Sequence, residues 1–446
     1  MNFIENLFLQ RKELEEKVKF ALSIAKKKCD AAEVLVNTIK GINVSTRFGK
    51  IENIEFNSDH LFHVIVYYKN CKGIASSTNL NLKIIENTVK LAFDIAKYVS
   101  EDPFVGLPDI DLLAYKAIDL KLFYPFDMDF KKAIQLASQA EISALKTDKK
   151  IKNTEGGNFN SYYGIKVFGN TAEMLQSYCL SQHSISSCVI AQENNSMERA
   201  NYYTVARKLE DLQSPQCVGY NAANRALSRL YPKKIYTMKT AVIFVAEIAA
   251  ELFYHLVHSI SGYNIYRKSS FLLHDLGKKI FPSWLTIKEK PHLIGGLASS
   301  PFDDEGVKTN QCNIVDQGIL QTWLLNSYSG RKLGLKSTGH ASGIHNWFIT
   351  HQELDFNALL KEMWKGLVIT ELMGQGVSLI NGNYSRGACG FWVENGVIKY
   401  PVSEITIVGN LKDMWSNIVM IGNDIDTRGK IQCGSLLLSE ICVSGL

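Results

Sequence analysis

Apolar residues in the first part of the chain recur with two different periods. Between Glu13 and Cys29 they fall at helical spacing with charged residues between them, which predicts an amphipathic helix. Residues 32–57 and 61–77 are instead rich in β-branched and aromatic residues and are interrupted by glycine. That composition is typical of β-strands joined by tight turns. The chain is therefore expected to begin with a helix followed by strands.

The same two patterns alternate as far as residue 230. Helical periodicity returns over 82–99 and 129–146, and strand-like sequence follows over 164–192. A further helix is predicted over 218–230, where it ends before a tyrosine and a proline. Alternating helices and strands of this kind predict an α+β domain, with helices packed on an antiparallel sheet.

We place a domain boundary near 231–240, because 446 residues exceed what one compact core holds. Two domains are expected, residues 1–235 and residues 236–446. The second contains many short alternating runs separated by glycine, and Asn395–Gly396 between two such runs predicts a hairpin. This domain is therefore predicted to be rich in antiparallel β-structure, as a barrel-like or sandwich sheet.

Composition narrows the class of protein. The net charge of +5 is small for this length and the basic residues are dispersed, which argues against a nucleic-acid or membrane-surface partner. The nine cysteines form no C-x-x-C pair, so reduced thiols are expected rather than a disulfide framework or a zinc ribbon. The longest apolar run, 240–256, is interrupted by Glu247 and Glu251, and the first twenty residues do not resemble a signal peptide. A cytoplasmic protein is the expectation.

The stretch "AELFYHLVHSISG", residues 250–262, contains Glu251, His255 and His258 at positions i, i+4 and i+7. On a helix these side chains share one face, and two imidazoles with a carboxylate are a ligand set for catalytic zinc. The zincin spacing H-E-x-x-H is nevertheless absent. Histidines in the last turn of a helix also interact favourably with its C-terminal dipole. Spacing alone therefore favours a helix end over a metal site.

A second stretch, "SSPFDDEGVKT", contains three consecutive acids: Asp303, Asp304 and Glu305. Neighbouring carboxylates can bind a cation or the amino group of a peptide. The proline before them and the glycine after them are also ordinary turn residues, which favours solvated acids in a turn.

Two glycine-bearing stretches closer to the C-terminus contain further candidate groups. His340 and His345 lie five residues apart in a predicted loop, where they form a weak metal-binding pattern. Ser385 and Cys389 are nucleophile types without a G-x-S-x-G elbow. Arg386 beside them is suited to a carboxylate or to the carbonyl groups of a peptide.

Long strings in the C-terminal half carry a more specific signal. "LASSPFDDEGVKT", "LGLKSTGHASGIHNW", "GNYSRGACGFWVENGVIKYPVSEITIVGNLKDM" and "IGNDIDTRGKIQCGSLLL" together resemble the TldD/PmbA family of peptidases, and more narrowly its PmbA branch, also called TldE. The resemblance covers nearly the whole second domain and extends more weakly into the first. It implies a metalloprotease that acts on flexible or unfolded polypeptides in an enclosed cleft.

In the TldD branch, an H-E-x-x-x-H helix before an R-K-G string supplies two zinc ligands and the general base, and a cysteine near the C-terminus is a further ligand. Counting back from Arg267–Lys268, these three helix positions fall on Tyr254, His255 and Ser259, and the cysteine position falls on Cys433. One thiolate cannot form a three-ligand zinc site. The resemblance therefore implies a helix with a degenerate zinc motif.

We expect this chain to be the PmbA/TldE-like component of a cytoplasmic metalloprotease, without catalytic residues or a cofactor of its own. Its zinc is expected in a TldD-like partner, its substrate is a peptide or an unfolded protein, and the isolated chain is expected to form a homodimer. The peptide contacts are predicted at Asp303, Asp304, Glu305, Ser385 and Arg386. Two alternatives stay open. One is a protease with a rearranged zinc site made of His255, His258 and Cys433, and the other is a regulatory or assembly protein without proteolytic function.

Overall fold

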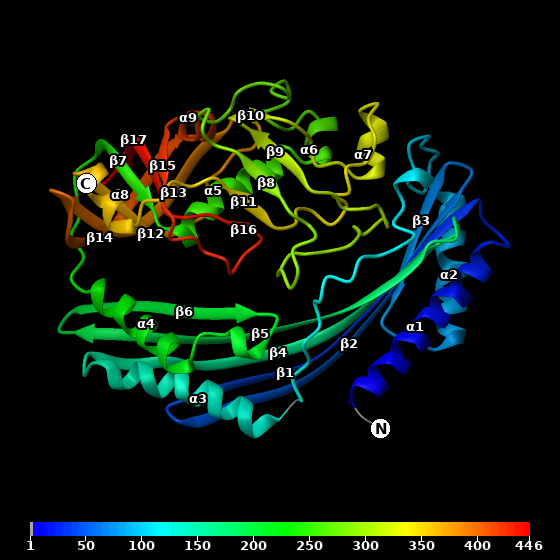
Figure 1. Cartoon of the computed structure of the whole chain (residues 1–446), viewed down its shortest axis with the longest axis horizontal. Helices are drawn as coiled ribbons and strands as arrows, with labels where there is room; N and C mark the ends of the chain where they lie inside the picture. Colours follow the sequence, from blue (N-terminus) through cyan, green and yellow to red (C-terminus); the bar gives the residue numbers. More distant parts are fainter. Residues whose placement is uncertain (1–2, 128) are drawn as a thin grey trace.

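The computed structural model describes residues 3–127 and 129–446, which form a long curved sheet and a compact β-rich part seated against it (Figure 1). The curved sheet has six antiparallel strands in the order β3-β2-β1-β4-β5-β6. These strands are β1 (Ala31–Arg47), β2 (Lys50–Tyr68), β3 (Cys71–Ser77), β4 (Ile151–Asn170), β5 (Leu175–Glu193) and β6 (Ser196–Ala206). The predicted antiparallel sheet is confirmed.

The helices of this part are α1 (Phe3–Ala25), α2 (Leu82–Tyr98), α3 (Phe130–Thr147) and α4 (Pro215–Ser228), with two short 3₁₀ turns at Ile110–Leu112 and Leu209–Asp211. The four helices pack on one face of the sheet, and the C-terminal part lies on the other (Figure 1). Successive side chains of β1 point to opposite faces of the sheet, which explains this division. Val34 and Val36 are buried against α1 and α2, whereas Leu35 between them packs toward Phe302 of the C-terminal part.

Helices α3 and α4 approach each other so closely that only glycine fits between them. A Cβ atom on Gly219 of α4 would lie 2.1 Å from the backbone oxygen of Ala140 in α3. Alanine normally favours a helix by about 1 kcal/mol over glycine, but here the clash with backbone opposes that preference.

We therefore expect Gly219→Ala to lower the free energy of unfolding by about 1–3 kcal/mol. Tyr220→Ala changes the exposed neighbour on the same helix, so it is expected to stay within about 0.5 kcal/mol of the parent protein. Urea unfolding of the two variants measures both values. A stabilised Gly219→Ala variant would contradict the close approach of the two helices.

The C-terminal part is built around a five-stranded barrel in the order β14-β13-β12-β7-β17, closed by pairing of β17 with β14. A sixth strand, β15, extends the sheet beyond β17. The strands are β7 (Met238–Phe244), β12 (Gly366–Met373), β13 (Asn383–Glu394), β14 (Val397–Asn410), β15 (Ile418–Ile421) and β17 (Leu436–Ser444). The predicted hairpin is confirmed, since Asn395 and Gly396 have positive φ angles of 55° and 68° between β13 and β14.

A smaller sheet, β10-β9-β8-β11-β16, adjoins the barrel. Its strands are β8 (Ile287–Glu289), β9 (Cys312–Asp316), β10 (Ile319–Leu320), β11 (Trp347–Ile349) and β16 (Ile431–Gln432). The helices of this part are α5 (Ala246–Ser259), α6 (Gly262–Tyr266), α7 (Ser327–Lys332), α8 (Phe356–Met363) and α9 (Leu411–Ser416). Most strand pairs are antiparallel, but β7 with β12 and β11 with β16 are parallel. Among the residues that the structure describes, no helix combines the length and apolarity that a bilayer crossing requires.

Candidate functional site

Helix α5 starts directly after barrel strand β7 and is anchored by its apolar face. Its side chains Ala249, Leu252, Phe253 and Leu256 are fully buried in the core of the C-terminal part. The opposite face presents Glu251, Tyr254, His255 and His258 to a cavity of about 290 Å³, which is also lined by Arg386 and by residues of the 374–379 segment. The predicted grouping of the acid and the two histidines on one face of the helix is confirmed.

Within the part of the chain that the structure describes, Glu251 forms one ion pair, which joins α5 to β13. Arg386 donates a hydrogen bond from Nη1 to Oε2 of Glu251, and its side chain is only 12% exposed. The Nε of Arg386 is buried without a hydrogen-bond partner. Glu251 is thus paired with a cation rather than held ready as a metal ligand or a base.

His255 is neutral at physiological pH. Burial lowers the pKa of this imidazole to about 4, and the positive charges of Arg386 and His258 lower it in the same direction. Its Nε2 is buried without a hydrogen-bond partner, and its ring lies edge-on to Tyr384 at a centroid distance of 5.9 Å. The ring is therefore an uncharged group in a partly apolar, positively charged setting.

This lowered pKa predicts a pH dependence of stability. A histidine whose pKa is lower in the folded state contributes its full stability above pH 6.5 and loses it as the pH falls toward 4. The loss is expected to reach about 3 kcal/mol. Urea unfolding between pH 7 and pH 4 should show a shallower decline for His255→Gln than for the parent protein. Parallel curves for the two proteins would contradict the assignment.

Two of the four positions that the family resemblance assigned to zinc chemistry, Ser259 and Cys433, form hydrogen bonds to the backbone in this fold. The hydroxyl of Ser259 is fully buried and donates to the backbone oxygen of His255 at 2.7 Å. The thiol of Cys433 is also fully buried and donates to the backbone oxygen of Gly434 at 3.2 Å. Burial and nearby acids raise the pKa of Cys433 well above its usual range. Tyr254 lines the cavity beside His255.

Within the described residues, the only group of three or more histidine, cysteine, aspartate or glutamate side chains with ligand atoms within 4.8 Å of one another is Glu289, His340 and His345. The rearranged set of His255, His258 and Cys433 is not gathered in this way. The structure thus brings His340 and His345, which formed only a weak metal-binding pattern in the sequence, together with Glu289, which the sequence analysis did not identify.

The acidic turn has a structural role in this fold. Oδ1 of Asp303 accepts hydrogen bonds from the backbone N–H groups of Glu305 at 3.0 Å and Val307 at 2.9 Å. Its Oδ2 accepts from the N–H of Ala341 at 3.0 Å. Asp303 is fully buried, and burial together with the charge of Glu305 raises its pKa to about 7. The turn is confirmed, but the expectation of a solvated acid is wrong for Asp303.

The remaining predicted peptide contacts lie in two separate places. Asp304 is exposed and pairs with Lys166 of the curved sheet at 2.6 Å, and Glu305 accepts from the N–H of Ser327 at 2.8 Å. Ser385 and Arg386 instead lie on β13, where the N–H of Ser385 donates to the backbone oxygen of Gly376. Among the described residues, no hydrogen bond or ion pair joins the two groups directly. Cys389 on the same strand is half-buried, and burial raises the pKa of its thiol.

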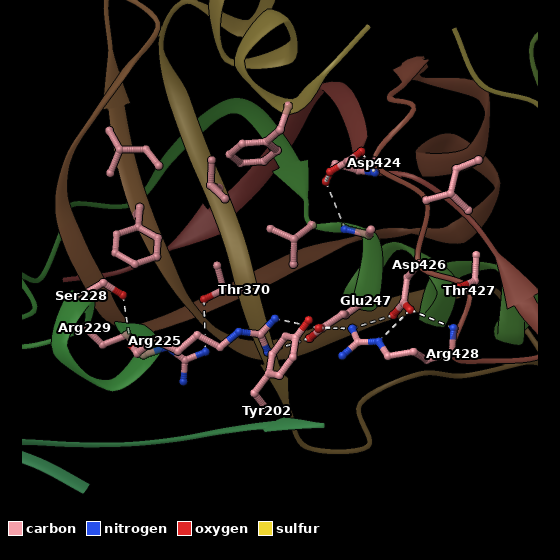
Figure 2. Close-up of a pocket in the computed structure, with 18 of the residues that line it drawn as sticks. Tyr202, Arg225, Ser228, Arg229, Glu247, Thr370, Asp424, Asp426, Thr427 and Arg428 are labelled. Atoms are coloured by element: carbon pink, nitrogen blue, oxygen red, sulfur yellow. Dashed lines mark hydrogen bonds and ion pairs between the residues drawn. The ribbon is translucent and has the colours of Figure 1, made fainter. Parts of the chain in front are cut away.

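A larger cavity of about 510 Å³ lies where the curved sheet meets the barrel (Figure 2). Arg225 of α4 forms two hydrogen bonds to Glu247 of α5, at 2.7 and 3.0 Å. Arg428 also pairs with Glu247, and its Nε donates to Asp426 at 2.8 Å. Although burial opposes ionisation of Glu247, the hydrogen bonds and charges of the two arginines lower its pKa. The wall of this cavity is therefore a charged network that joins the two parts of the chain.

Sequence reasoning did not identify this network. Its members come from α4, α5 and the segment between β15 and β16, and only Glu247 had been noted, as an interruption of an apolar run. The sequence signal was "NDIDTRG", which concentrates Asp424, Asp426 and Arg428 in seven residues. The cavity is close to the cysteine of the family pattern, because the N–H of Asp426 donates to the backbone oxygen of Cys433 at 3.0 Å.

Comparison with known proteins places the whole chain in one family. Three family models match in order: the PmbA/TldA metallopeptidase domain 1 over 32–96, the central domain over 123–230 and the C-terminal domain over 237–445. Metalloprotease PmbA of Escherichia coli O157:H7 is 60% identical over 445 residues, which cover 100% of this chain and 99% of that protein.

Solved structures confirm the fold. A Bacteroides thetaiotaomicron protein is 26% identical with a TM-score of 0.91, covering 97% of this chain and 99% of that chain. TldE from Thermococcus kodakarensis is 17% identical with a TM-score of 0.83, covering 96% of this chain and 100% of that chain. The chain belongs to the PmbA/TldD family of metallopeptidases, in its PmbA (TldE) branch.

Proposed function

We propose that this chain is one subunit of a cytoplasmic metalloprotease. This subunit has no catalytic zinc of its own and works with a TldD-like partner. The partner holds the zinc, and this chain shapes the cleft and binds the flexible or unfolded peptide. The proposal rests mainly on the two positions of α5 where the family resemblance expects zinc-binding histidines. Ser259 occupies one of them and donates its hydroxyl to the helix backbone, and Tyr254 occupies the other and lines the cavity.

Two further observations support a non-catalytic α5. The thiol of Cys433 is fully buried and donates to the backbone oxygen of Gly434, and it forms no group of neighbouring ligand atoms with the two histidines of α5 in the described part of the chain. Glu251, the acid on the cavity face, is paired with Arg386. A carboxylate that acts as general base must be free to take a proton from a metal-bound water, and the pairing with Arg386 opposes this at Glu251.

Peptide binding is proposed along the two cavities rather than at the acidic turn. Arg386 borders the smaller cavity, and Arg225, Arg229 and Arg428 border the larger one. Arginines donate to carboxylates and backbone carbonyl groups, which every peptide offers irrespective of its sequence. The edge strand β6 lies along the larger cavity, where the backbone oxygen of Tyr203 already accepts from Arg428 at 3.0 Å. Asp303 is an unsuitable contact, because both of its oxygens are occupied by backbone N–H groups.

The proposal is tested by assaying cleavage of an unfolded polypeptide with this chain alone, with the TldD-like chain of the same cell alone, and with both. Activity is expected only when both chains are present. Zinc-dependent cleavage by this chain alone would contradict the proposal and favour the rearranged site. Full activity of the TldD-like chain without this one would instead favour the regulatory alternative.

A further inference from the structure

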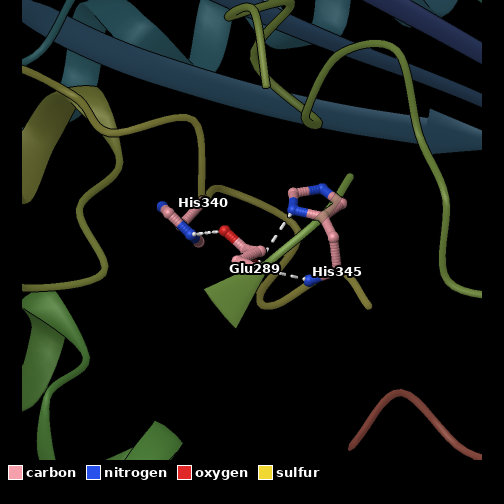
Figure 3. Close-up of side chains that lie close together, drawn as sticks. All are labelled: Glu289, His340 and His345. Carbon is pink, nitrogen blue, oxygen red and sulfur yellow. Dashed lines mark hydrogen bonds and ion pairs between the residues drawn. The ribbon is translucent and has the colours of Figure 1, made fainter. Parts of the chain in front are cut away.

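The Glu289–His340–His345 cluster lies outside α5 and both cavities, and the proposed function does not use it (Figure 3). Its three side chains are 1%, 8% and 3% exposed. Glu289 ends strand β8, and the two histidines belong to the loop that precedes β11. Figure 3 shows both imidazoles directed at the carboxylate of Glu289.

The buried carboxylate of Glu289 lacks a permanent positive partner. Its oxygens accept hydrogen bonds from Nε2 of His340 at 2.6 Å, from the N–H of His345 at 2.7 Å and from Nε1 of Trp347 at 3.1 Å. Across residues 3–127 and 129–446, no lysine or arginine forms an ion pair with it. A buried carboxylate is stable only with a compensating charge, which here comes from a protonated imidazole or from a cation.

His345 provides an independent indication. Both of its ring nitrogens are buried without a hydrogen-bond partner, although Nδ1 lies 3.4 Å from Oε1 of Glu289. A buried imidazole whose Nε2 has no partner and whose Nδ1 has only this long contact with a carboxylate is costly, and such a group is better satisfied by a ligand at Nδ1. A metal ion between His345 and Glu289 would satisfy the nitrogen and neutralise the carboxylate together.

The surroundings match those of a metal site. Ligand atoms of a tetrahedral zinc ion lie about 3.3 Å apart, as follows from zinc–nitrogen bonds of about 2.0–2.1 Å, so the 3.4 Å separation of Nδ1 and Oε1 already fits. Nδ1 of His340 lies 2.8 Å from the hydroxyl of Thr338, the type of second contact that orients a ligating histidine. The gap between His340 and Glu289 would need to widen by less than an ångström, about one shift of a side chain.

A fourth ligand is available on the neighbouring strand. Glu289 of β8 pairs in register with Cys312 of β9, so the two side chains lie on the same face of the sheet. The thiol of Cys312 is half-buried and lies 4.0 Å from Oε2 of Glu289. Cys312 lies outside the group of ligand atoms that are within 4.8 Å of one another, so its side chain must turn toward the imidazoles to complete a closed tetrahedral set of the structural type.

We propose that Glu289, His340, His345 and Cys312 bind one structural zinc ion that ties β8 and β9 to the loop before β11. Binding forms four metal–ligand bonds and releases to solvent the thiol proton of Cys312 and the proton between His340 and Glu289. This site departs from the expectation, drawn from the sequence, that the chain holds no metal. It is separate from the catalytic zinc proposed for the partner and requires no peptidase activity.

The test uses the full chain, stripped with a chelator, reloaded with zinc chloride and dialysed. We expect one zinc ion per chain by elemental analysis, and an affinity at least about 10-fold lower for His340→Gln and His345→Gln. His292→Gln removes a nearby half-buried histidine that bonds Thr309 and is not a proposed ligand, so it should bind zinc like the parent protein. His258→Gln on α5 should also retain zinc. Loading with cobalt should give a thiolate charge-transfer band that Cys312→Ser abolishes.

Several outcomes would overturn the proposal. The proposal is overturned if the parent chain takes up no zinc and its melting temperature is unchanged by zinc and by chelator. This result does not depend on whether any variant folds. Zinc that survives His345→Gln but is lost in His258→Gln would place the metal on α5 instead. A cobalt spectrum without a thiolate band would remove Cys312 from the ligand set. None of these readouts involves peptide cleavage, so this site and the proposed function fail independently.

Discussion

Replacing Asp303 by alanine is expected to lower the free energy of unfolding by about 3–5 kcal/mol at pH 8. Its carboxylate is fully buried and accepts three backbone hydrogen bonds, two within its own turn and one from Ala341. Alanine leaves those N–H groups buried and unpaired, and each unsatisfied group costs about 1–3 kcal/mol. The chosen pH lies above the raised pKa of Asp303, so the carboxylate is ionised in the parent protein. Urea unfolding measures the change.

The neighbouring residue provides a matched control. Asp304 is exposed and forms one ion pair with Lys166, so Asp304→Ala is expected to cost at most about 1 kcal/mol. Equal effects of the two alanine variants would show that the acids are interchangeable turn residues and would contradict the buried role of Asp303.

The second large effect is expected at the charged network between the curved sheet and the barrel. Arg428 is 13% exposed, pairs with Glu247 and Asp426, and donates to the backbone oxygen of Tyr203. Arg428→Ala leaves two partly buried carboxylates with one fewer cation, which is expected to cost about 3 kcal/mol. The loss should appear as an earlier urea unfolding transition.

Two comparisons isolate the origin of this loss. Arg199→Ala removes an exposed arginine that pairs with Glu155 at 2.6 Å, so its cost should stay below about 1 kcal/mol. The double variant Arg428→Ala with Glu247→Ala should cost less than the sum of the single changes, because removing both charges leaves fewer unpaired groups. Strict additivity would mean that the two side chains do not depend on each other.

Elements whose pattern is local could be predicted from the sequence. The periodicities over 82–99 and 129–146 correspond to α2 and α3, and Asn395–Gly396 forms the turn between β13 and β14. The shared face of Glu251, His255 and His258 also followed from helical geometry, because α5 is regular at these positions. Such features depend on side chains a few residues apart.

Features that depend on distant contacts could not be predicted. Turn residues around Asp303 indicated a turn. The side chain of Asp303 is buried under a distant segment, where the N–H of Ala341, 38 residues further along the chain, donates to its carboxylate. Glu289 was not recognised because the loop histidines meet it only through the pairing of β8 with β11. Arg428 and Glu247 are separated by 181 residues, so no local pattern connects them. The charge of a residue can be read from the sequence, but its partner is decided by topology.

The proposed function places the catalytic zinc in the TldD-like partner, and a triple variant of this chain can show whether it lies there. Cleavage of an unfolded polypeptide is assayed with the TldD-like chain combined with this chain carrying His255→Gln, His258→Gln and Cys433→Ala. His255 and His258 line the smaller cavity, so a lower affinity for the polypeptide is expected, but at saturating polypeptide the complex should keep its zinc-dependent cleavage, because these side chains are not proposed to bind the catalytic metal. The opposite result is a complex that still assembles and folds but has no more activity than a zinc-free complex. That result would place the catalytic zinc in this chain and contradict the proposed function.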